Sequence, residues 1–203
     1  MDYSLYYVAD VSQVPREKYL DVLEAALRGG VSIVQIRAKE LTWPEFLTLA
    51  TRVKKLCNKY DVPFVVNDRV DITLASQANG VHLGEMDLSV SIARKVLEKK
   101  SIIGKTVRSV DEAVRAEQEG ASYVSVGSIY PTKTKLVPKI VGPSMIRRVK
   151  EEVKIPVVAI GGINLKNARA VIRSGADGIA VVTAIAHARN PFTAASKLRH
   201  LIK

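Results

Sequence analysis

Two aspartates follow strand-like segments that lie close together in the chain. Asp68 comes directly after the apolar segment Phe64–Asn67, and Asp87 follows Gly80–Leu83 after a short loop. In a parallel barrel, neighbouring strands would bring these two carboxylates to the same rim. Two carboxylates beside basic residues suit a divalent cation such as Mg²⁺ that shares its ligation with a phosphate. Each aspartate could instead cap a helix N-terminus, and Ser89 competes with Asp87 for that role.

Gln35, Arg37 and Lys39 alternate along one strand-like segment, so their side chains should share one face of it. Arg37 can bind phosphate oxygens through its planar guanidinium, and Lys39 supplies a compact positive charge. The alternative is a structural ion pair between these cations and the two aspartates. We favour anion binding, because a metal held by the aspartates would leave the cations free for phosphate.

A long segment after the sixth strand-like run contains Thr132, Lys133, Thr134 and Lys135 and extends to about Val141. Loops of this length in compact domains often act as functional lids. Hydroxyl groups and a lysine suit a phosphate or a leaving group. The alternative is a flexible basic surface loop, and composition does not separate the two.

Paired glycines, Gly161 and Gly162, end the seventh strand-like run, and Val182 and Thr183 end the eighth. In eightfold barrels this is the usual phosphate site, since glycine lets backbone N–H groups approach an anion near a helix N-terminus. The alternative is a tight turn, and we favour phosphate.

Strand-like and helix-like segments alternate along the whole chain, as in Lys18–Arg28, Trp43–Tyr60 and Ser109–Glu119, where apolar residues recur three and four apart. Such alternation implies a parallel sheet with right-handed crossovers. Eight units in 203 residues favour one (β/α)8 TIM barrel domain over residues 1–203, rather than an open doubly wound sheet. The expected strands are Leu5–Ala9, Ile33–Arg37, Phe64–Asn67, Gly80–Leu83, Ile102–Val107, Tyr123–Gly127, Val157–Ile160 and Gly178–Val182.

The composition is that of an ordinary globular protein, with 47% apolar and 25% charged residues. No apolar run approaches the roughly 20 residues of a membrane span, and the early first strand leaves no room for a signal peptide, so we expect a cytoplasmic protein. A lone Cys57 excludes a disulfide framework. The net charge of +11 could indicate nucleic-acid binding, but the basic residues are scattered and aromatic residues total only 5%. We therefore expect neither a nucleic-acid nor a membrane partner.

Several of these segments together resemble the thiamine phosphate synthase family over nearly the whole chain. The most specific combination joins the motifs Gln-x-Arg-x-Lys, Asn-Asp-Arg and Pro-Thr-x-Thr-Lys, whereas the glycine-rich phrases occur in many phosphate-binding barrels. The residues that carry the resemblance are Val34–Lys39, Val66–Ile72, Gly80–Gly84 with Asp87, Gly127–Lys135, Ala159–Ile163 and Gly175–Thr183.

The resemblance implies a transferase that couples a hydroxymethylpyrimidine diphosphate to a thiazole phosphate, giving thiamine phosphate and pyrophosphate. It implies one Mg²⁺ per subunit on Asp68 and Asp87, and a dissociative substitution in which Arg37, Lys39 and Lys135 stabilise the leaving pyrophosphate. The pyrimidine diphosphate would be held by Gln35, Arg37, Lys39, Asn67, Thr106 and Lys135. The thiazole phosphate would be held by Thr132, Lys133, Thr134, Gly162, Val182 and Thr183.

Two positions depart from the family pattern. Ala38 stands where aspartate is common, which affects a local ion pair, and Thr106 stands where serine is common, which affects the reach of a hydroxyl. The nearest rival function is a related barrel that isomerises a thiazole carboxylate phosphate. That reaction expels no diphosphate and has no evident use for the two aspartates with Gln35 and Lys39. A homo-oligomer is possible, and the sequence does not decide it.

Overall fold

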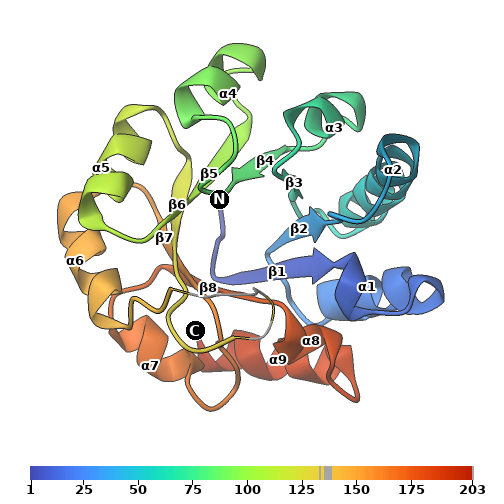
Figure 1. Cartoon of the computed structure of the whole chain (residues 1–203). Coiled ribbons are helices and arrows are strands. Elements are labelled where there is room, and N and C mark those ends of the chain that lie inside the picture. Colours follow the sequence, from blue (N-terminus) through green and yellow to red (C-terminus); the bar gives the residue numbers. More distant parts are fainter. Residues whose placement is uncertain (133, 135–138, 203) are drawn as a thin grey trace.

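A computed structural model describes residues 1–132, 134 and 139–202 of the chain. Within these residues, eight parallel strands close into a barrel in the order β1 to β8, with β8 paired to β1. The helices form a ring around the strands (Figure 1). The strands are β1 Leu5–Asp10, β2 Ile33–Arg37, β3 Phe64–Asn67, β4 Gly80–Leu83, β5 Ile102–Val107, β6 Tyr123–Val126, β7 Val157–Ile160 and β8 Gly178–Val181.

The (β/α)8 barrel predicted from the sequence is confirmed, and five of the eight strands have the expected bounds. The other three differ by one residue at the carboxyl end: β1 continues to Asp10, whereas β6 and β8 end at Val126 and Val181. The extension of β1 matters for the site, because its last residue is an acid that points into the barrel mouth.

Helices follow the strands and cover their outer faces. The three helices expected from periodicity begin and end within one residue of the predicted positions. The helices are α1 Tyr19–Arg28, α2 Trp43–Lys59, α3 Val70–Ala75, α4 Val90–Val96, α5 Val110–Gln118, α6 Ser144–Glu152, α7 Ala168–Arg173, α8 Thr183–Ala186 and α9 Pro191–Leu201, with 3₁₀ turns at Val11–Gln13 and Arg16–Lys18. No helix in the described part of the chain combines the length and the apolar character needed to cross a membrane.

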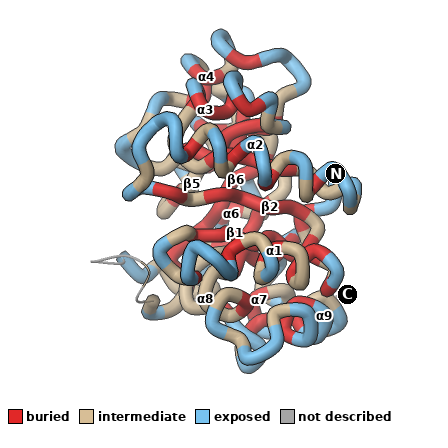
Figure 2. Tube along the Cα trace, turned by 90° about the vertical axis from the view of Figure 1, so that its right-hand side faces the viewer, coloured by how far each residue is buried: buried red, intermediate tan, exposed pale blue. Residues whose placement is uncertain are grey.

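The apolar core has two layers. The larger layer lies between the strands and the helices, and the buried residues follow the strands in Figure 2, while the outer faces of the helices are exposed. The smaller layer fills the barrel interior and contains Tyr3, Tyr6 and Tyr123 beside aliphatic residues. Strands with both faces covered are expected to be rich in Val and Ile, which is what these segments contain.

Candidate active site

The carboxyl ends of the strands surround two adjoining cavities of about 280 and 490 Å³. The smaller one, which we call the charged cavity, lies over β1 to β5 and is lined by several acidic and basic side chains of the described residues. The larger one, which we call the glycine-rich cavity, lies over β6 to β8. Four residues line both cavities: Thr106, Thr134, Ile160 and Val182.

The charged cavity brings together the side chains that the sequence assigned to a metal and a diphosphate. They come from the ends of β2, β3, β4 and β5 and the loops that follow. The predicted residues that line it are Gln35, Arg37, Lys39, Asn67, Asp68, Asp87 and Thr106. Lys135 lies outside the described residues.

Asp68 and Asp87 converge beside Gly84. A methyl group on Gly84 would lie 3.0 Å from Asp87 Oδ2 and 4.0 Å from Asp68 Oδ1. The Gly84 N–H donates to Asp87 Oδ2 at 2.6 Å, and the Asp68 N–H donates to the carbonyl of His82 at 2.8 Å. Asp68 has a φ of +66°, a left-handed conformation that is rare outside glycine and is often found at functional sites. The fold therefore holds the Asp68 carboxylate in place at some conformational cost.

Neither aspartate serves as a helix cap. Ser89 is the N-cap of α4 and accepts from the Ile92 N–H at 3.3 Å, and Arg69 occupies the N-cap position of α3. Ser89, and not Asp87, therefore caps α4. Both carboxylates remain directed into the cavity.

The negative charge of Asp68 is disfavoured in this position. Burial, followed by the hydrogen bond and charge of Asp87, raises the pKa of Asp68 from 3.8 to about 6, and the charge of Lys39 opposes this shift. Lys39 Nζ lies 3.5 Å from Asp68 Oδ2. A small dication would offset this cost, and two carboxylate oxygens are the ligand type that Mg²⁺ prefers. The described residues contain no group of three or more His, Cys, Asp or Glu side chains that could hold a metal.

The raised pKa predicts how stability depends on pH when no divalent cation is present. The folded state binds a proton at Asp68 more tightly than the unfolded state, so stability falls as pH rises from about 4 to about 6. Asp68→Asn removes this cost and should raise the melting temperature by a few degrees at pH 7.5, with the gain vanishing near pH 4. Thermal unfolding across this pH range is the measurement.

Asp71→Asn is the matched control with the opposite sign. A hydrogen bond from Arg69 is the main cause that lowers the pKa of Asp71 to about 2, so the Asp71 carboxylate stabilises the fold above pH 4. Its replacement should lower the melting temperature at pH 7.5. Equal shifts for Asp68→Asn at pH 4 and pH 7.5 would contradict the raised pKa of Asp68.

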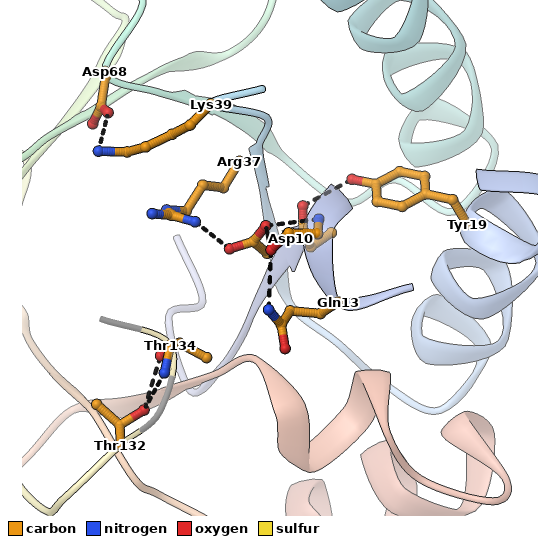
Figure 3. Close-up of polar contacts among 10 residues, drawn as sticks. Asp10, Gln13, Tyr19, Arg37, Lys39, Asp68, Thr132 and Thr134 are labelled. Carbon is orange, nitrogen blue, oxygen red and sulfur yellow. Dashed lines mark hydrogen bonds and ion pairs between the residues drawn. The ribbon is translucent and has the colours of Figure 1, made fainter. Parts of the chain in front are cut away.

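Asp10 is a residue of the site that the sequence analysis missed. It ends β1 opposite Arg37 in register, is 3% exposed, and forms an ion pair with the Arg37 guanidinium. The other Asp10 oxygen accepts from the Ser12 N–H at 3.0 Å and the Ser12 hydroxyl at 2.8 Å. Figure 3 shows Arg37 directed toward Asp10 and Lys39 toward Asp68. Arg37 and Lys39 are thus both paired with acids, and the only signal for Asp10 in the sequence was an acid at the end of the first strand.

Arg108 is a second missed residue. It follows β5, lines the charged cavity and forms an ion pair with Glu85 of the loop after β4. The alternation that identifies Thr106 at the end of this strand places Arg108 on the same side. The charged cavity therefore has a third cation among its described residues, besides Arg37 and Lys39.

The glycine-rich cavity contains the residues predicted to hold the second phosphate. Thr132 and Thr134 share a hydrogen bond of 2.8 Å between their hydroxyls, and both appear together on the far side of the mouth in Figure 3. The predicted residues that line this cavity are Thr132, Thr134, Gly162, Val182 and Thr183. Lys133 lies outside the described residues.

Gly162 is required by its backbone and by its surroundings. Its φ is +65°, and an added methyl group would lie 2.4 Å from the carbonyl oxygen of Pro131 and 2.8 Å from Cβ of Tyr130. Gly162→Ala must therefore displace the backbone on one side of the cavity. We expect it to raise the Michaelis constant for a phosphate bound there by about tenfold to a hundredfold, as steady-state kinetics would measure.

Gly142→Ala is the matched control for that change. Gly142 has a φ of +75°, but an added methyl group would meet no atom of the described residues within 4 Å. It carries the same left-handed backbone cost, about 1 kcal/mol, without the clash. A similar Michaelis constant in both variants would show that backbone strain alone, rather than the shape of the cavity, accounts for the effect.

Comparison with known proteins gives a consistent result. A family model described as thiamine monophosphate synthase matches residues 5–185. The thiamine-phosphate synthase of Methanospirillum hungatei is 46% identical over 186 residues, covering 91% of this chain and 90% of that protein. That of Methanobrevibacter smithii is 42% identical over 198 residues, covering 98% and 94%. The solved structure of thiamine phosphate pyrophosphorylase from Pyrococcus furiosus superposes with a TM-score of 0.91 at 38% identity, covering 99% of this chain and 96% of that one.

Proposed function

The chain belongs to the thiamine monophosphate synthase family, and from this premise we propose which two compounds it joins. It couples 4-amino-2-methyl-5-hydroxymethylpyrimidine diphosphate to 4-methyl-5-(2-hydroxyethyl)thiazole phosphate, releasing pyrophosphate and thiamine phosphate. The pyrimidine diphosphate occupies the charged cavity, and the thiazole phosphate occupies the glycine-rich cavity.

One observation carries the proposal: two cavities of different chemistry share a wall. The charged cavity has the acids and cations that a diphosphate with a divalent metal requires, and the glycine-rich cavity has the hydroxyls and glycines of a barrel phosphate site. Thr106, Thr134, Ile160 and Val182 line both, so reacting groups of two bound substrates can meet there. Holding two reactants in contact is itself a large part of catalysis.

Asp68 and Asp87 would hold one Mg²⁺: the two carboxylates converge beside Gly84, and burial together with the neighbouring Asp87 disfavours the negative charge of Asp68 in the absence of a cation. Bound there, Mg²⁺ would act as a Lewis acid that neutralises charge on the diphosphate. The left-handed backbone at Asp68 fixes one ligand in advance. The short hydrogen bond from Gly84 fixes the other.

Arg37, Lys39 and Lys135 stabilise the negative charge that grows on the departing pyrophosphate. Arg37 forms an ion pair with Asp10, and Lys39 Nζ lies 3.5 Å from Asp68 Oδ2, so both cations are held beside the charged cavity. These cations favour cleavage of the carbon–oxygen bond when they bind the leaving group more tightly than the intact diphosphate. The electron-rich aminopyrimidine then supports a cationic methylene, which the thiazole nitrogen attacks, so the substitution is dissociative and needs no nucleophile from the protein.

The direct test is incubation of the purified protein with both substrates and Mg²⁺, with separate assays for thiamine phosphate and pyrophosphate. Equimolar formation of the two products is the expected result. Pyrophosphate release without thiamine phosphate would contradict the assignment of the second substrate. Conversion of a thiazole carboxylate phosphate alone, without coupling, would favour the isomerase alternative.

A further inference from the structure

A continuous chain of hydrogen bonds crosses the interior of the barrel beneath the charged cavity. Gln35 Nε2 donates to the Tyr6 hydroxyl at 2.8 Å, and the hydroxyls of Tyr6 and Tyr123 lie 2.7 Å apart. The Tyr123 hydroxyl lies 2.8 Å from Nδ1 of His82. Nε2 of His82 lies 2.9 Å from Oγ1 of Thr106. The five residues come from β1, β2, β4, β5 and β6, and we call them the polar chain.

The middle of the polar chain is fully enclosed by protein. Tyr6 is 1% exposed and Tyr123 is 0% exposed, and their rings pack against each other in the inner core. The described lining of the charged cavity includes Gln35, His82 and Thr106. The two tyrosines therefore act on a ligand in this cavity through Gln35, His82 and Thr106.

The number of donors and acceptors in the polar chain fixes the direction of its hydrogen bonds. Burial raises the pKa of both Tyr6 and Tyr123, so both hydroxyls keep their protons. Buried donors need acceptors. With Gln35 donating to Tyr6, each hydroxyl has an acceptor within the chain only if Tyr6 donates to Tyr123 and Tyr123 donates to His82 Nδ1.

The same count of donors and acceptors sets the protonation of His82 and the hydrogen-bonding direction of Thr106 and Gln35. His82 is then neutral, with its proton on Nε2, and donates to Thr106 Oγ1. The Thr106 hydroxyl proton is left to point toward the cavity. Because Gln35 Nε2 is directed at Tyr6, its Oε1 is the part of the amide left to accept a hydrogen bond from a ligand.

We propose that Tyr6, Tyr123 and His82 are positioning residues that fix the hydrogen-bonding sense of Gln35 and Thr106, and that this sense selects an amino-substituted over an oxo-substituted pyrimidine diphosphate. This inference rests on the proposed function and goes beyond it. An amino group donates to Gln35 Oε1. In the 4-oxo analogue a carbonyl oxygen replaces the amino group and the adjacent ring nitrogen carries a proton. The donor of the amino compound is thus replaced by an acceptor, and its ring-nitrogen acceptor becomes a donor.

Breaking the chain should relax this selection. In Tyr123→Phe, Tyr6 loses its acceptor and can donate to Gln35 Oε1 after the amide rotates, which turns the Gln35 N–H groups toward the ligand. Loss of a positioning contact in general would weaken both ligands alike, whereas rotation of the amide changes their ratio. The ratio is therefore the measurement that separates a positioning role from a merely structural one.

Calorimetric titration with the 4-amino and 4-oxo pyrimidine diphosphates, in Mg²⁺ and without thiazole phosphate, measures that ratio. A site built to pair a polar group rejects a mismatched ligand strongly, so we expect the native protein to prefer the amino compound by about a thousandfold. Tyr123→Phe and Tyr6→Phe should each reduce the preference at least about tenfold. Tyr3→Phe is the control, since the Tyr3 ring packs on Tyr123 at 4.9 Å but lies outside the polar chain.

An unchanged ratio in folded Tyr123→Phe and Tyr6→Phe would overturn the inference. Nitrogen-15 NMR of the His82 ring tests the inference without altering the polar chain. The measurement uses the double variant His187→Gln with His200→Gln, in which His82 is the one histidine that remains of three. Protonation at Nε2 alone supports the inference, and protonation at Nδ1 overturns it. Turnover of the native protein on its two substrates separately tests the proposed function, so the two failures are distinguishable.

Discussion

Asp68→Asn is expected to lower Mg²⁺-dependent formation of thiamine phosphate by at least about a thousandfold while the barrel stays folded. The change removes the charge of one of two carboxylates that meet beside Gly84 but keeps the shape of the side chain. Asparagine also tolerates the left-handed backbone found at this position, whereas alanine would add strain that obscures the result. Steady-state kinetics over a range of Mg²⁺ concentrations is the measurement.

The control for this variant is Asp61→Asn. Asp61 also has a positive φ, 52°, but it is exposed in the turn between α2 and β3, at the opposite end of the barrel. It should leave both turnover and the Mg²⁺ dependence unchanged. Addition of Mg²⁺ should raise the melting temperature of the native protein but not that of Asp68→Asn. Full turnover in Asp68→Asn would remove the metal assignment.

Arg37→Gln is expected to lower kcat/KM for the pyrimidine diphosphate by about a hundredfold to a thousandfold, because it removes a charge-assisted contact to the leaving group. It also leaves Asp10, which is 3% exposed, without its cation. Breaking a buried pair in this way should lower the free energy of unfolding by about 3 kcal/mol. Denaturant unfolding and initial-rate kinetics measure the two effects.

Combining Arg37→Gln with Asp10→Asn separates stability from catalysis. The double variant carries no unpaired carboxylate at the end of β1, so most of the lost stability should return. Its activity should stay low, because the guanidinium is still absent. Recovery of activity together with stability would mean that Arg37 serves the fold and not the leaving group.

The Arg37–Asp10 pair shows what local sequence patterns do not predict. Arg37 was recognised because its alternation with Gln35 and Lys39 is a local property of one strand. Its partner Asp10 is 27 residues away and becomes its neighbour only through the parallel register of β1 and β2. The sequence analysis considered only Asp68 and Asp87 as acidic partners for these cations, and it missed the acid at the end of β1 that pairs with Arg37.

By itself, the sequence determined the order and type of the elements, the barrel and the rim at which the candidate site residues meet. This was possible because periodicities of two and 3.6 residues reflect burial within each element, and because parallel strands all end at one rim. Tertiary structure alone decided the polar chain. Tyr6 and Tyr123 are separated by 117 residues, and their hydroxyls meet only because closure of the barrel turns β1 and β6 toward one interior. Local spacing describes which way a side chain leaves its strand, but the group it meets depends on the curvature and register of all eight strands together.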